Sequence, residues 1–307
     1  MSTVLPLIIF NPKSGRGITE REWASRAAVI RNQLGPFDGK FTEKQGDAIR
    51  IAEEEATAGR KLIVAMGGDG TISEVANGIL QSGMPAELGV LPGGTGGDFR
   101  RTLNVPANLA QAARKLKEGN ARSMDVGRIS FVHHDGKKGT RYFINTASFG
   151  MSGQVASRAN RSAKRLGGTV TYAVATFQTL FSYKYPNVSL QWDDQPASLL
   201  KVITVCIANG PSFGGGMRIA PRAKLNDGMF DMVIIGNLTP AQIVMNSYRL
   251  YTGSFLGLKN VAAMNVKKVN ASPVNQDEEI LMEADGETPG RLPATIEILP
   301  GALRIRY

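Results

Sequence analysis

The fold of this chain follows from one stretch, Leu62-Ile63-Val64-Ala65-Met66-Gly67-Gly68-Asp69-Gly70-Thr71. Its first five residues form a short apolar run with β-branched side chains, which is typical of a buried parallel strand. Apolar residues then recur with helical spacing at positions 72, 75, 76, 79 and 80. The order strand, glycine-rich turn, helix places backbone N–H groups at a helix N-terminus, where phosphate is favoured. The glycines permit positive φ angles and let a ligand approach the backbone closely.

Asp69 is an unusual residue for a phosphate-binding turn. A carboxylate repels phosphate unless a cation lies between them, so Asp69 predicts a bound metal ion, Mg²⁺. The alternative is an ordinary strand–helix turn in which the aspartate caps the helix. The rest of the chain favours the ligand-binding interpretation.

Two more loops in the first half follow predicted strands. Asn11-Pro12-Lys13-Ser14-Gly15 comes after the strand Leu5–Phe10, and its lysine suggests a phosphate contact or an ordinary basic loop. The strand Leu88–Leu91 runs into a second glycine-rich turn, 92–101, which carries Thr95 and Asp98. Because strands and helices alternate here, we expect a doubly wound parallel sheet with both glycine turns at the same edge, where ligands bind.

The composition indicates a globular chain of 307 residues with one large domain or two. A net charge of +10 favours anionic partners, namely nucleic acid, acidic membranes or phosphorylated substrates, although a basic protein without such partners fits equally well. Cys206 is the only cysteine, so we expect no internal disulfide and a reducing cytoplasm. No signal peptide or membrane span is expected, so any contact with membranes is predicted to be transient.

The second half of the sequence reads as mostly β, with a domain boundary after Met124. We expect a turn at 145–153 and a helix within 163–181 that buries Phe177 and Phe181. A second amphipathic helix is expected at 242–255, including Tyr251. These apolar stripes are interpreted as core, or alternatively as the lining of an acyl-chain pocket. Single strands are expected at 127–133, 141–147, 188–192, 199–208, 229–235 and 259–269, with 295–299 and 302–307 pairing at the end.

Two acidic loops in this half are candidates for chemistry. The loop Lys224–Met229 offers the Asp227 carboxylate and backbone carbonyls to a hard cation, or it is a hairpin turn. The strand Ile280–Glu283 runs into Asp285-Gly286-Glu287. Two acidic residues at a strand end make a candidate general base, and Asp-Gly is also typical of a type I′ hairpin turn.

These motifs together resemble one family, the diacylglycerol kinase-like lipid kinases, which include bacterial lipid kinases and sphingosine kinases. No single motif is specific, but seven of them occur in order over nearly the whole chain. They are Asn11–Gly15, Thr42, Gly67–Thr71 with Glu74, Pro92–Phe99, Met124–Gly127, Asn226–Met229 and Asp285–Glu287.

The resemblance implies a doubly wound, NAD kinase-like α/β nucleotide domain at residues 1–124 and a mostly β sandwich domain at 125–307 that contributes catalytic acids and a lipid pocket. It implies transfer of the γ-phosphoryl group of ATP to a lipid hydroxyl with Mg²⁺, by positioning and charge neutralisation. The implied nucleotide-binding residues are Asn11, Pro12, Lys13, Ser14, Gly15, Thr42, Gly67, Gly68, Asp69, Gly70, Thr71, Glu74, Gly94 and Thr95.

The same resemblance assigns the acidic residues. Asp69, Asp98 and Asp125 would hold Mg²⁺ directly or through water, and either Asp285 or Glu287 would take the proton from the acceptor. The second, structural metal site would be formed by the carbonyls of Lys224 and Met229 and the carboxylate of Asp227.

One departure from the family pattern lies in the second loop, which usually reads Gly-Thr-x-Asn-Asp-Phe-Ala. Here Gly97 replaces the asparagine and Arg100 replaces the alanine. We hypothesise that nucleotide affinity or acceptor choice is altered, and a Gly97→Asn variant that left both unchanged would count against this.

Two other functions remain open at this level. One is a kinase of a non-lipid acceptor in the same superfamily, such as an NAD kinase-like enzyme, and the other is a non-catalytic protein that binds nucleotide or lipid. Nucleic-acid binding is not expected, because the aromatic residues are few and are not interleaved with the basic ones. The resemblance favours a cytoplasmic enzyme that visits anionic membranes and allows a homodimer, and the acceptor lipid is not specified.

Overall fold

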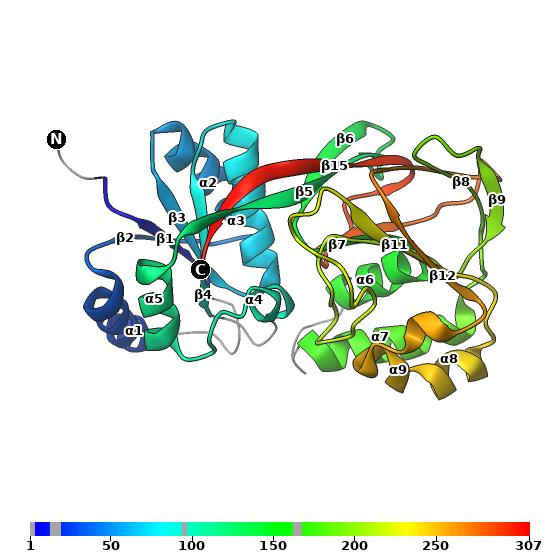
Figure 1. The fold of residues 1–307 in the computed structure, drawn as a ribbon, viewed down its shortest axis with the longest axis horizontal. Coiled ribbons are helices and arrows are strands. Elements are labelled where there is room, and N and C mark those ends of the chain that lie inside the picture. The colour runs from blue at the N-terminus through cyan, green and yellow to red at the C-terminus, as the bar shows by residue number, and fades with distance from the viewer. Residues whose placement is uncertain (1–3, 13–19, 94–96, 162–167) are drawn as a thin grey trace. The chain divides into compact units, whose positions relative to one another are not determined.

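The computed structural model describes residues 4–12, 20–93, 97–161 and 168–307 (Figure 1). Contacts within the chain divide it into two units, Met1–Met124 with Gly301–Tyr307, and Asp125–Pro300. From the sequence we expected residues 125–307 to form the second domain. The structure returns the last residues to the first unit, because the end of strand β15 (Arg291–Arg306) pairs in parallel with β4 (Glu87–Pro92).

The first unit is an α/β fold around a parallel sheet. Its strand order is β2 (Asp38–Phe41), β1 (Leu7–Phe10), β3 (Leu62–Gly67) and β4. The interiors of β1, β3 and β4 are buried, which explains why they read as continuous apolar runs. Helices α2 (Asp47–Thr57) and α3 (Asp69–Ser82) pack together, as do α1 (Glu20–Leu34) and α5 (Leu109–Glu118). Helix α4 (Asp98–Thr102) follows the second glycine turn.

The second unit is a β-sandwich. One antiparallel sheet has the order β12 (Val261–Val266), β11 (Phe230–Ile235), β10 (Thr204–Ala208), β7 (Thr146–Gly150) and β14 (Met282–Ala284). The other contains β15, β13 (Lys268–Pro273), β8 (Asn187–Trp192) and β9 (Ser198–Lys201), with β5 (Ala121–Val132) and β6 (Lys138–Phe143). Inner-face residues of both sheets, such as Phe149, Met232 and Ile296, form one core.

Helices cover one end of the second unit (Figure 1). They are α6 (Met151–Arg161), α7 (Gly168–Ser182), α8 (Pro240–Asn246) and α9 (Tyr248–Thr252), followed by a 3₁₀ turn, Phe255–Gly257. Helix α6 packs against β7, β14 and α7. Among the described residues, no helix is both long enough and apolar enough to cross a lipid bilayer.

Several strand predictions for the second unit were wrong in the same way. The runs 141–147, 199–208 and 259–269 were each expected as one strand, and each is two strands that lie in different sheets. The expected turn at 145–153 is strand β7 followed by the start of α6. The segments 295–299 and 302–307 do not pair with each other, because both belong to β15, and Gly301 adopts a φ of 63° within it.

The apolar stripes expected as core are partly on the surface. Phe177 and Phe181 of α7 are 62% and 63% exposed, and Tyr251 of α9 is 57% exposed. Among the described side chains of these stripes, only Leu180 and Phe255 are buried. The two phenylalanine rings of α7 pack edge to face on the surface, with their centroids 5.1 Å apart.

Candidate active site

The predicted nucleotide residues of the first unit gather at one edge of its sheet. The parallel register places Phe10 opposite both Phe41 and Met66. The next residues, Asn11, Thr42 and Gly67, therefore leave the sheet at the same edge. The Asn11 N–H donates to the Met66 carbonyl, and its side-chain amide lies 3.5 Å from the Thr71 hydroxyl. This edge is formed by the carboxyl ends of parallel strands, where α/β sheets bind ligands.

The glycines of the two turns serve two different needs. Gly67 and Gly93 allow close packing, because a Cβ on Gly93 would lie 2.8 Å from Gly67 N and a Cβ on Gly67 would clash with the Thr71 side chain. A Cβ on Gly68 or Gly70 would meet no atom within 4 Å. None of Gly67, Gly68 and Gly70 uses the positive φ that glycine permits, and Gly68 is extended, with φ −88°. Open space therefore lies beside the N-terminus of α3.

Asp69 binds the start of helix α4. Its Oδ2 accepts hydrogen bonds from the backbone N–H groups of Gly97 at 2.9 Å and Asp98 at 3.1 Å, and its Oδ1 accepts one from Phe99 at 3.1 Å. The carboxylate thus fixes the second glycine loop against the first. A carboxylate has about four acceptor positions, so these three bonds leave about one for a metal ion or its water.

The charged residues after the second turn are bound within the protein. Asp98 is buried and forms an ion pair with Arg101 at 2.5 Å. Arg100 donates from Nη1 to the Val105 carbonyl at 2.6 Å, so its guanidinium holds the loop. Gly97 has φ 103°, which strains any residue with a Cβ. A Gly97→Asn variant would therefore strain the backbone as well as adding an amide.

Thr42 and Glu74 surround the start of helix α2. Thr42 is buried, and its N–H donates to the Phe10 carbonyl. Glu74 reaches from α3 and accepts hydrogen bonds from Gly46 N at 3.1 Å and Ala48 N at 3.2 Å. Glu74 therefore caps α2 and shapes the loop that follows Thr42.

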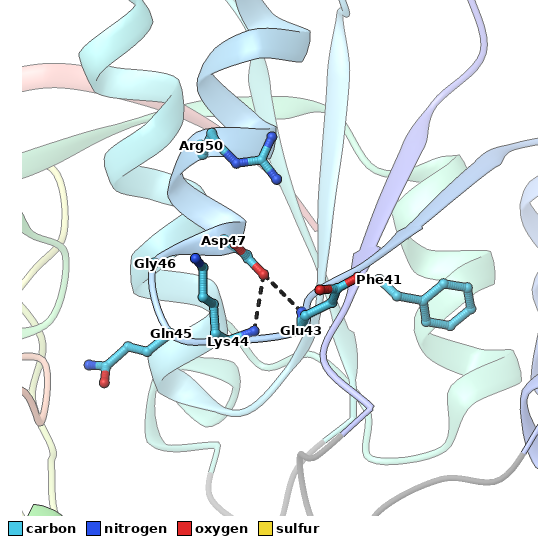
Figure 2. A pocket seen from close by; sticks show the side chains of 7 residues that line it. All are labelled: Phe41, Glu43, Lys44, Gln45, Gly46, Asp47 and Arg50. Atoms are coloured by element: carbon cyan, nitrogen blue, oxygen red, sulfur yellow. Dashed lines mark hydrogen bonds between the residues drawn. The ribbon is translucent and has the colours of Figure 1, made fainter.

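That loop forms one wall of a cavity of about 510 Å³ (Figure 2). Asp47 Oδ2 accepts the N–H groups of Glu43 at 2.9 Å and Lys44 at 3.0 Å, and these bonds lower the pKa of the Asp47 carboxyl. Lys44 and Arg50 bring positive charge to the cavity and Glu43 and Asp47 bring equal negative charge, so the cavity is polar and carries no net charge. It is lined by Phe41, Glu43, Lys44, Gln45, Gly46, Asp47 and Arg50.

Some of the predicted residues lie outside the part of the chain that the structure describes. These are Lys13, Ser14 and Gly15 of the first loop and Gly94 and Thr95 of the second. Pro12 is described and is partly exposed at the start of its turn.

In the second unit, the predicted acid pair lies on a tight hairpin turn. Asp285 has φ 47° and Gly286 has φ 88°, and Ala284 and Glu287 exchange backbone hydrogen bonds of 2.8 and 3.0 Å. Positive φ at both central residues is the type I′ geometry that Asp-Gly favours. The turn therefore presents two carboxylates from a rigid backbone.

The two carboxylates of this turn have different surroundings. Asp285 accepts three backbone N–H groups from the β6–β7 connection, those of Ile144, Asn145 and Thr146, at 2.9, 3.0 and 3.1 Å. Glu287 forms an ion pair with Arg141 of β6, with Nη2 and Oε2 2.8 Å apart, and without the alignment of a hydrogen bond. Asp285 is thus an anchor of the turn, and Glu287 keeps acceptor capacity for a substrate proton.

Glu283 belongs to this site and was missed by the sequence analysis. It is buried on β14 opposite Ser148, whose hydroxyl donates to Glu283 Oε2 at 2.6 Å, and Gly286 N donates to Oε1 at 2.5 Å. Burial raises the pKa of Glu283 to about 7, with a further increase from Asp285 and a decrease from the two hydrogen bonds. The available signal was an acidic residue inside the apolar run Ile280–Ala284.

The raised pKa makes folding stability depend on pH. Between the ordinary pKa of 4.5 and about 7, native Glu283 retains a proton that the unfolded chain has lost, so the free energy of unfolding falls as pH rises. The total loss is about 3 kcal/mol and is complete above pH 7. Glu283→Gln should lack this loss, because its amide can accept from Gly286 and donate to Ser148. Urea unfolding of both proteins from pH 4 to 8 measures the difference, and a constant difference across that range would contradict this prediction.

Asp125 is placed at the predicted structural metal loop. It is buried, and its Oδ2 accepts from Gly228 N at 2.7 Å while its own N–H donates to the Leu225 carbonyl. Asn209 donates to the Asp125 carbonyl at 2.9 Å. Asp125 therefore fixes the loop that contains the predicted ligands Lys224, Asp227 and Met229.

The side chains of this loop alone do not supply enough ligands for a hard cation. Asp227 Oδ1 accepts from Met229 N at 3.2 Å. Burial raises the pKa of Asp231, and the nearby Asp227 charge raises it further. A cation between these two carboxylates would relieve that repulsion. Among the described side chains, no three of His, Cys, Asp and Glu converge as a metal site, so backbone carbonyls would have to complete this one.

Comparisons with known proteins agree with both units. Residues 6–129 match the diacylglycerol kinase catalytic domain, and residues 145–307 match the YegS C-terminal NAD kinase beta sandwich-like domain. A protein of Bacillus subtilis (strain 168) named diacylglycerol kinase is 31% identical over 288 residues, covering 93% of this chain and 90% of that protein. One of the same name from Staphylococcus epidermidis (strain ATCC 12228) is 30% identical over 290 residues, covering 94% and 87%.

A solved structure shares the whole fold. It comes from Bacillus anthracis str. Sterne, is provisionally named a diacylglycerol kinase, and is 26% identical, with a TM-score of 0.79 over 100% of this chain and 98% of that one. The family match in the second unit alone extends over more than half of the sequence. The chain therefore belongs to the diacylglycerol kinase-like family of lipid kinases.

Proposed function

We propose that this lipid kinase transfers the γ-phosphoryl group of ATP, with Mg²⁺, to the hydroxyl of a diacylglycerol-like or sphingoid lipid. The observation that carries the proposal is the open space beside Gly68 and Gly70 at the N-terminus of α3. Backbone N–H groups at a helix start favour phosphate, and the absence of Cβ atoms lets phosphate reach them. The relatives named diacylglycerol kinase support a lipid acceptor.

The first unit binds the nucleotide in this proposal. The α3 turn holds phosphates, and the polar cavity beside Thr42 suits another part of the nucleotide. Asp69 and Asp98 would hold Mg²⁺ directly or through water, and the ion would supply positive charge beside the phosphates. The three N–H groups on Asp69 keep the two glycine loops at a fixed distance from each other.

Glu287 takes the proton from the acceptor hydroxyl, and Asp285 anchors the turn that carries it. This assignment follows from their hydrogen bonds, because Asp285 is occupied by three N–H groups whereas Glu287 faces one side-chain cation. A base must reach the proton that it abstracts, so the less occupied carboxylate is the better candidate.

Filling the space beside Gly70 tests the nucleotide site directly. Gly70→Leu should weaken ATP binding by about tenfold or more, because the new side chain occupies the proposed phosphate position. The fold should be unaffected, since leucine is a better helix former than glycine. Isothermal titration with ATP and Mg²⁺ measures the effect. Gly257→Leu is the matched control, because a Cβ there also meets nothing within 4 Å. Unchanged ATP affinity in the Gly70 variant would refute this placement.

We further propose that helices α8 and α9 contact the anionic membrane that holds the acceptor. Neither helix has a buried residue, and Met245, Tyr248 and Tyr251 are 74%, 60% and 57% exposed. The segment 240–252 contains no acidic residue, and Arg249 lies within it. Arg218 is held beside the end of α9, because its N–H donates to the Leu250 carbonyl. Apolar and cationic side chains on one exposed segment suit an anionic lipid surface.

A charge on this segment should weaken membrane binding. Met245→Glu is expected to lower affinity for vesicles containing phosphatidylglycerol by about tenfold, because it loses apolar burial and adds repulsion. Sedimentation with vesicles measures the affinity, and activity on a short-chain lipid dissolved as monomers should be unchanged. Leu199→Glu is the matched control, since Leu199 on β9 is 72% exposed. Equal losses in both variants would argue against a contact specific to α8 and α9.

A further inference from the structure

Glu283 lies on the outer face of its sheet, under helix α6. Its strand neighbours Met282 and Ala284 point into the core between the two sheets, so Glu283 points away from that core. The register aligns it with Ser148 on β7 and, beyond that, Cys206 on β10. Helix α6 packs on β7 and β14, which encloses this row of side chains.

A carboxyl group at such a position is costly for stability. Its two hydrogen-bond donors, the Ser148 hydroxyl and the Gly286 N–H, are neutral. Burying a carboxyl group without a cation is unfavourable, and apolar residues of similar volume are often at least as stable in such places. The sandwich does not need an acid here for its packing, which indicates another reason for Glu283.

The hydrogen bonds of Glu283 lead to the turn that carries the proposed base. The bond from Gly286 N fixes the peptide between Asp285 and Gly286. On the other side, Asn160 of α6 donates to the Gly286 carbonyl at 3.2 Å. Through Ser148, the same carboxyl group is tied to the middle of β7. Gly286 is thus bonded through both of its backbone polar groups, immediately before Glu287.

We propose that Glu283 is a positioning residue, which holds the Asp285-Gly286-Glu287 turn in the geometry that phosphoryl transfer requires. The role rests on the proposed function of Glu287. A residue after a type I′ turn can shift when the central peptide rotates, and small displacements of a catalytic group lower the rate strongly. Glu283 prevents that rotation from inside the sheet, where water does not compete for its bonds.

Two variants of Glu283 separate positioning from stability. Glu283→Leu has similar volume but makes neither bond. Removing the buried carboxyl group favours stability, whereas leaving the Ser148 hydroxyl and the Gly286 N–H without their acceptor opposes it, so the variant is assayed at a temperature where it is folded. We expect it to lose about tenfold or more in kcat, with KM for ATP unchanged. Glu283→Gln can make both bonds and should keep kcat within about twofold. Met282→Leu is the control for repacking β14, since Met282 is buried and makes no bond to the turn.

Amide hydrogen exchange gives a readout that does not depend on activity. The Gly286 amide should exchange about tenfold faster in Glu283→Leu than in the wild type, and at the wild-type rate in Glu283→Gln. An unchanged Gly286 rate in Glu283→Leu, or a wild-type kcat in that variant, would overturn the proposal. If the wild-type protein phosphorylates no lipid, the proposed function fails, and the exchange rates still decide whether Glu283 fixes the turn.

Discussion

Glu287→Gln is expected to lower the rate of phosphoryl transfer by about 100- to 10,000-fold, which is the usual contribution of a general base. The amide is similar in shape and cannot accept a proton from the acceptor hydroxyl. The fold should remain, because an amide oxygen can still accept from Arg141, although both side chains are mostly buried and loss of the charged partner there lowers stability. The measurement is kcat with ATP in excess, together with KM for ATP, which should not change.

The matched control for Glu287 is Glu297→Gln. Glu297 is also a glutamate of the second unit that pairs with arginine, at 2.7 Å from Arg128, and with Lys268 at 2.9 Å. It has no place in the proposed chemistry, so kcat should stay within about twofold of the wild type. If Glu287→Gln also keeps more than a tenth of the wild-type kcat, Glu287 is not the base, and Asp285 becomes the remaining acid of the turn.

Asp69→Asn is expected to lower both stability and activity. The three N–H groups of Gly97, Asp98 and Phe99 would share one amide oxygen, and the side-chain NH₂ would face a donor. Leaving a largely buried donor unsatisfied should lower the free energy of unfolding by about 1 to 3 kcal/mol. Phosphoryl transfer should fall by about 100-fold or more, since both the loop geometry and the remaining metal-binding position are lost.

Asp193→Asn shows which part of this effect is structural. Asp193 accepts the N–H groups of Lys267 at 2.8 Å and Lys268 at 2.9 Å, in a hairpin of the second unit. Its variant should lose stability with little change in kcat at a temperature where both proteins are folded. If Asp69→Asn behaves in the same way, Asp69 is a helix cap and does not take part in binding Mg·ATP. Urea unfolding and steady-state kinetics on the same samples distinguish these results.

The first unit could be predicted well from its sequence, because local signals are sufficient there. The run Leu62–Met66 ends at a glycine and is buried on both faces, so its length and composition identify a central parallel strand. The helix after Asp69 keeps an apolar stripe and ends at Gly83 in the left-handed conformation. Because the strands are parallel, their carboxyl ends lie at one edge of the sheet, and no further information is needed to place the predicted site residues there.

The second unit was less predictable, because its strands change sheets within apolar runs. Val202 and Ile203 connect β9 and β10 and are both buried, so the pattern shows no break where the chain passes between sheets. Helix α6 begins directly after β7, and its first turn contains the small residues Ser152 and Gly153. Because these are poor helix formers, the sequence predicted a turn there. Burial against the sheet determines that helix.

The roles of the acidic residues could not be separated by sequence. Asp69 and Asp285 were identified as candidates, but both accept three backbone N–H groups in the folded chain. A carboxylate that caps backbone groups and one that binds metal or protons look alike in a sequence, because both need the same chemical group in a loop. Glu283 was missed for a related reason, since its bonds depend on the register of β14 with β7.

The most direct test of the central claim follows label from ATP labelled at the γ-phosphorus to lipid, in anionic mixed micelles with Mg²⁺. Diacylglycerol, sphingosine, ceramide and phosphatidylglycerol are offered separately to the wild type and to Glu287→Gln. We predict labelled lipid from at least one acceptor with the wild type, none when Mg²⁺ is chelated, and almost none with the variant. Binding of Mg·ATP without label in any lipid would contradict the account and would leave a nucleotide-binding protein with another acceptor.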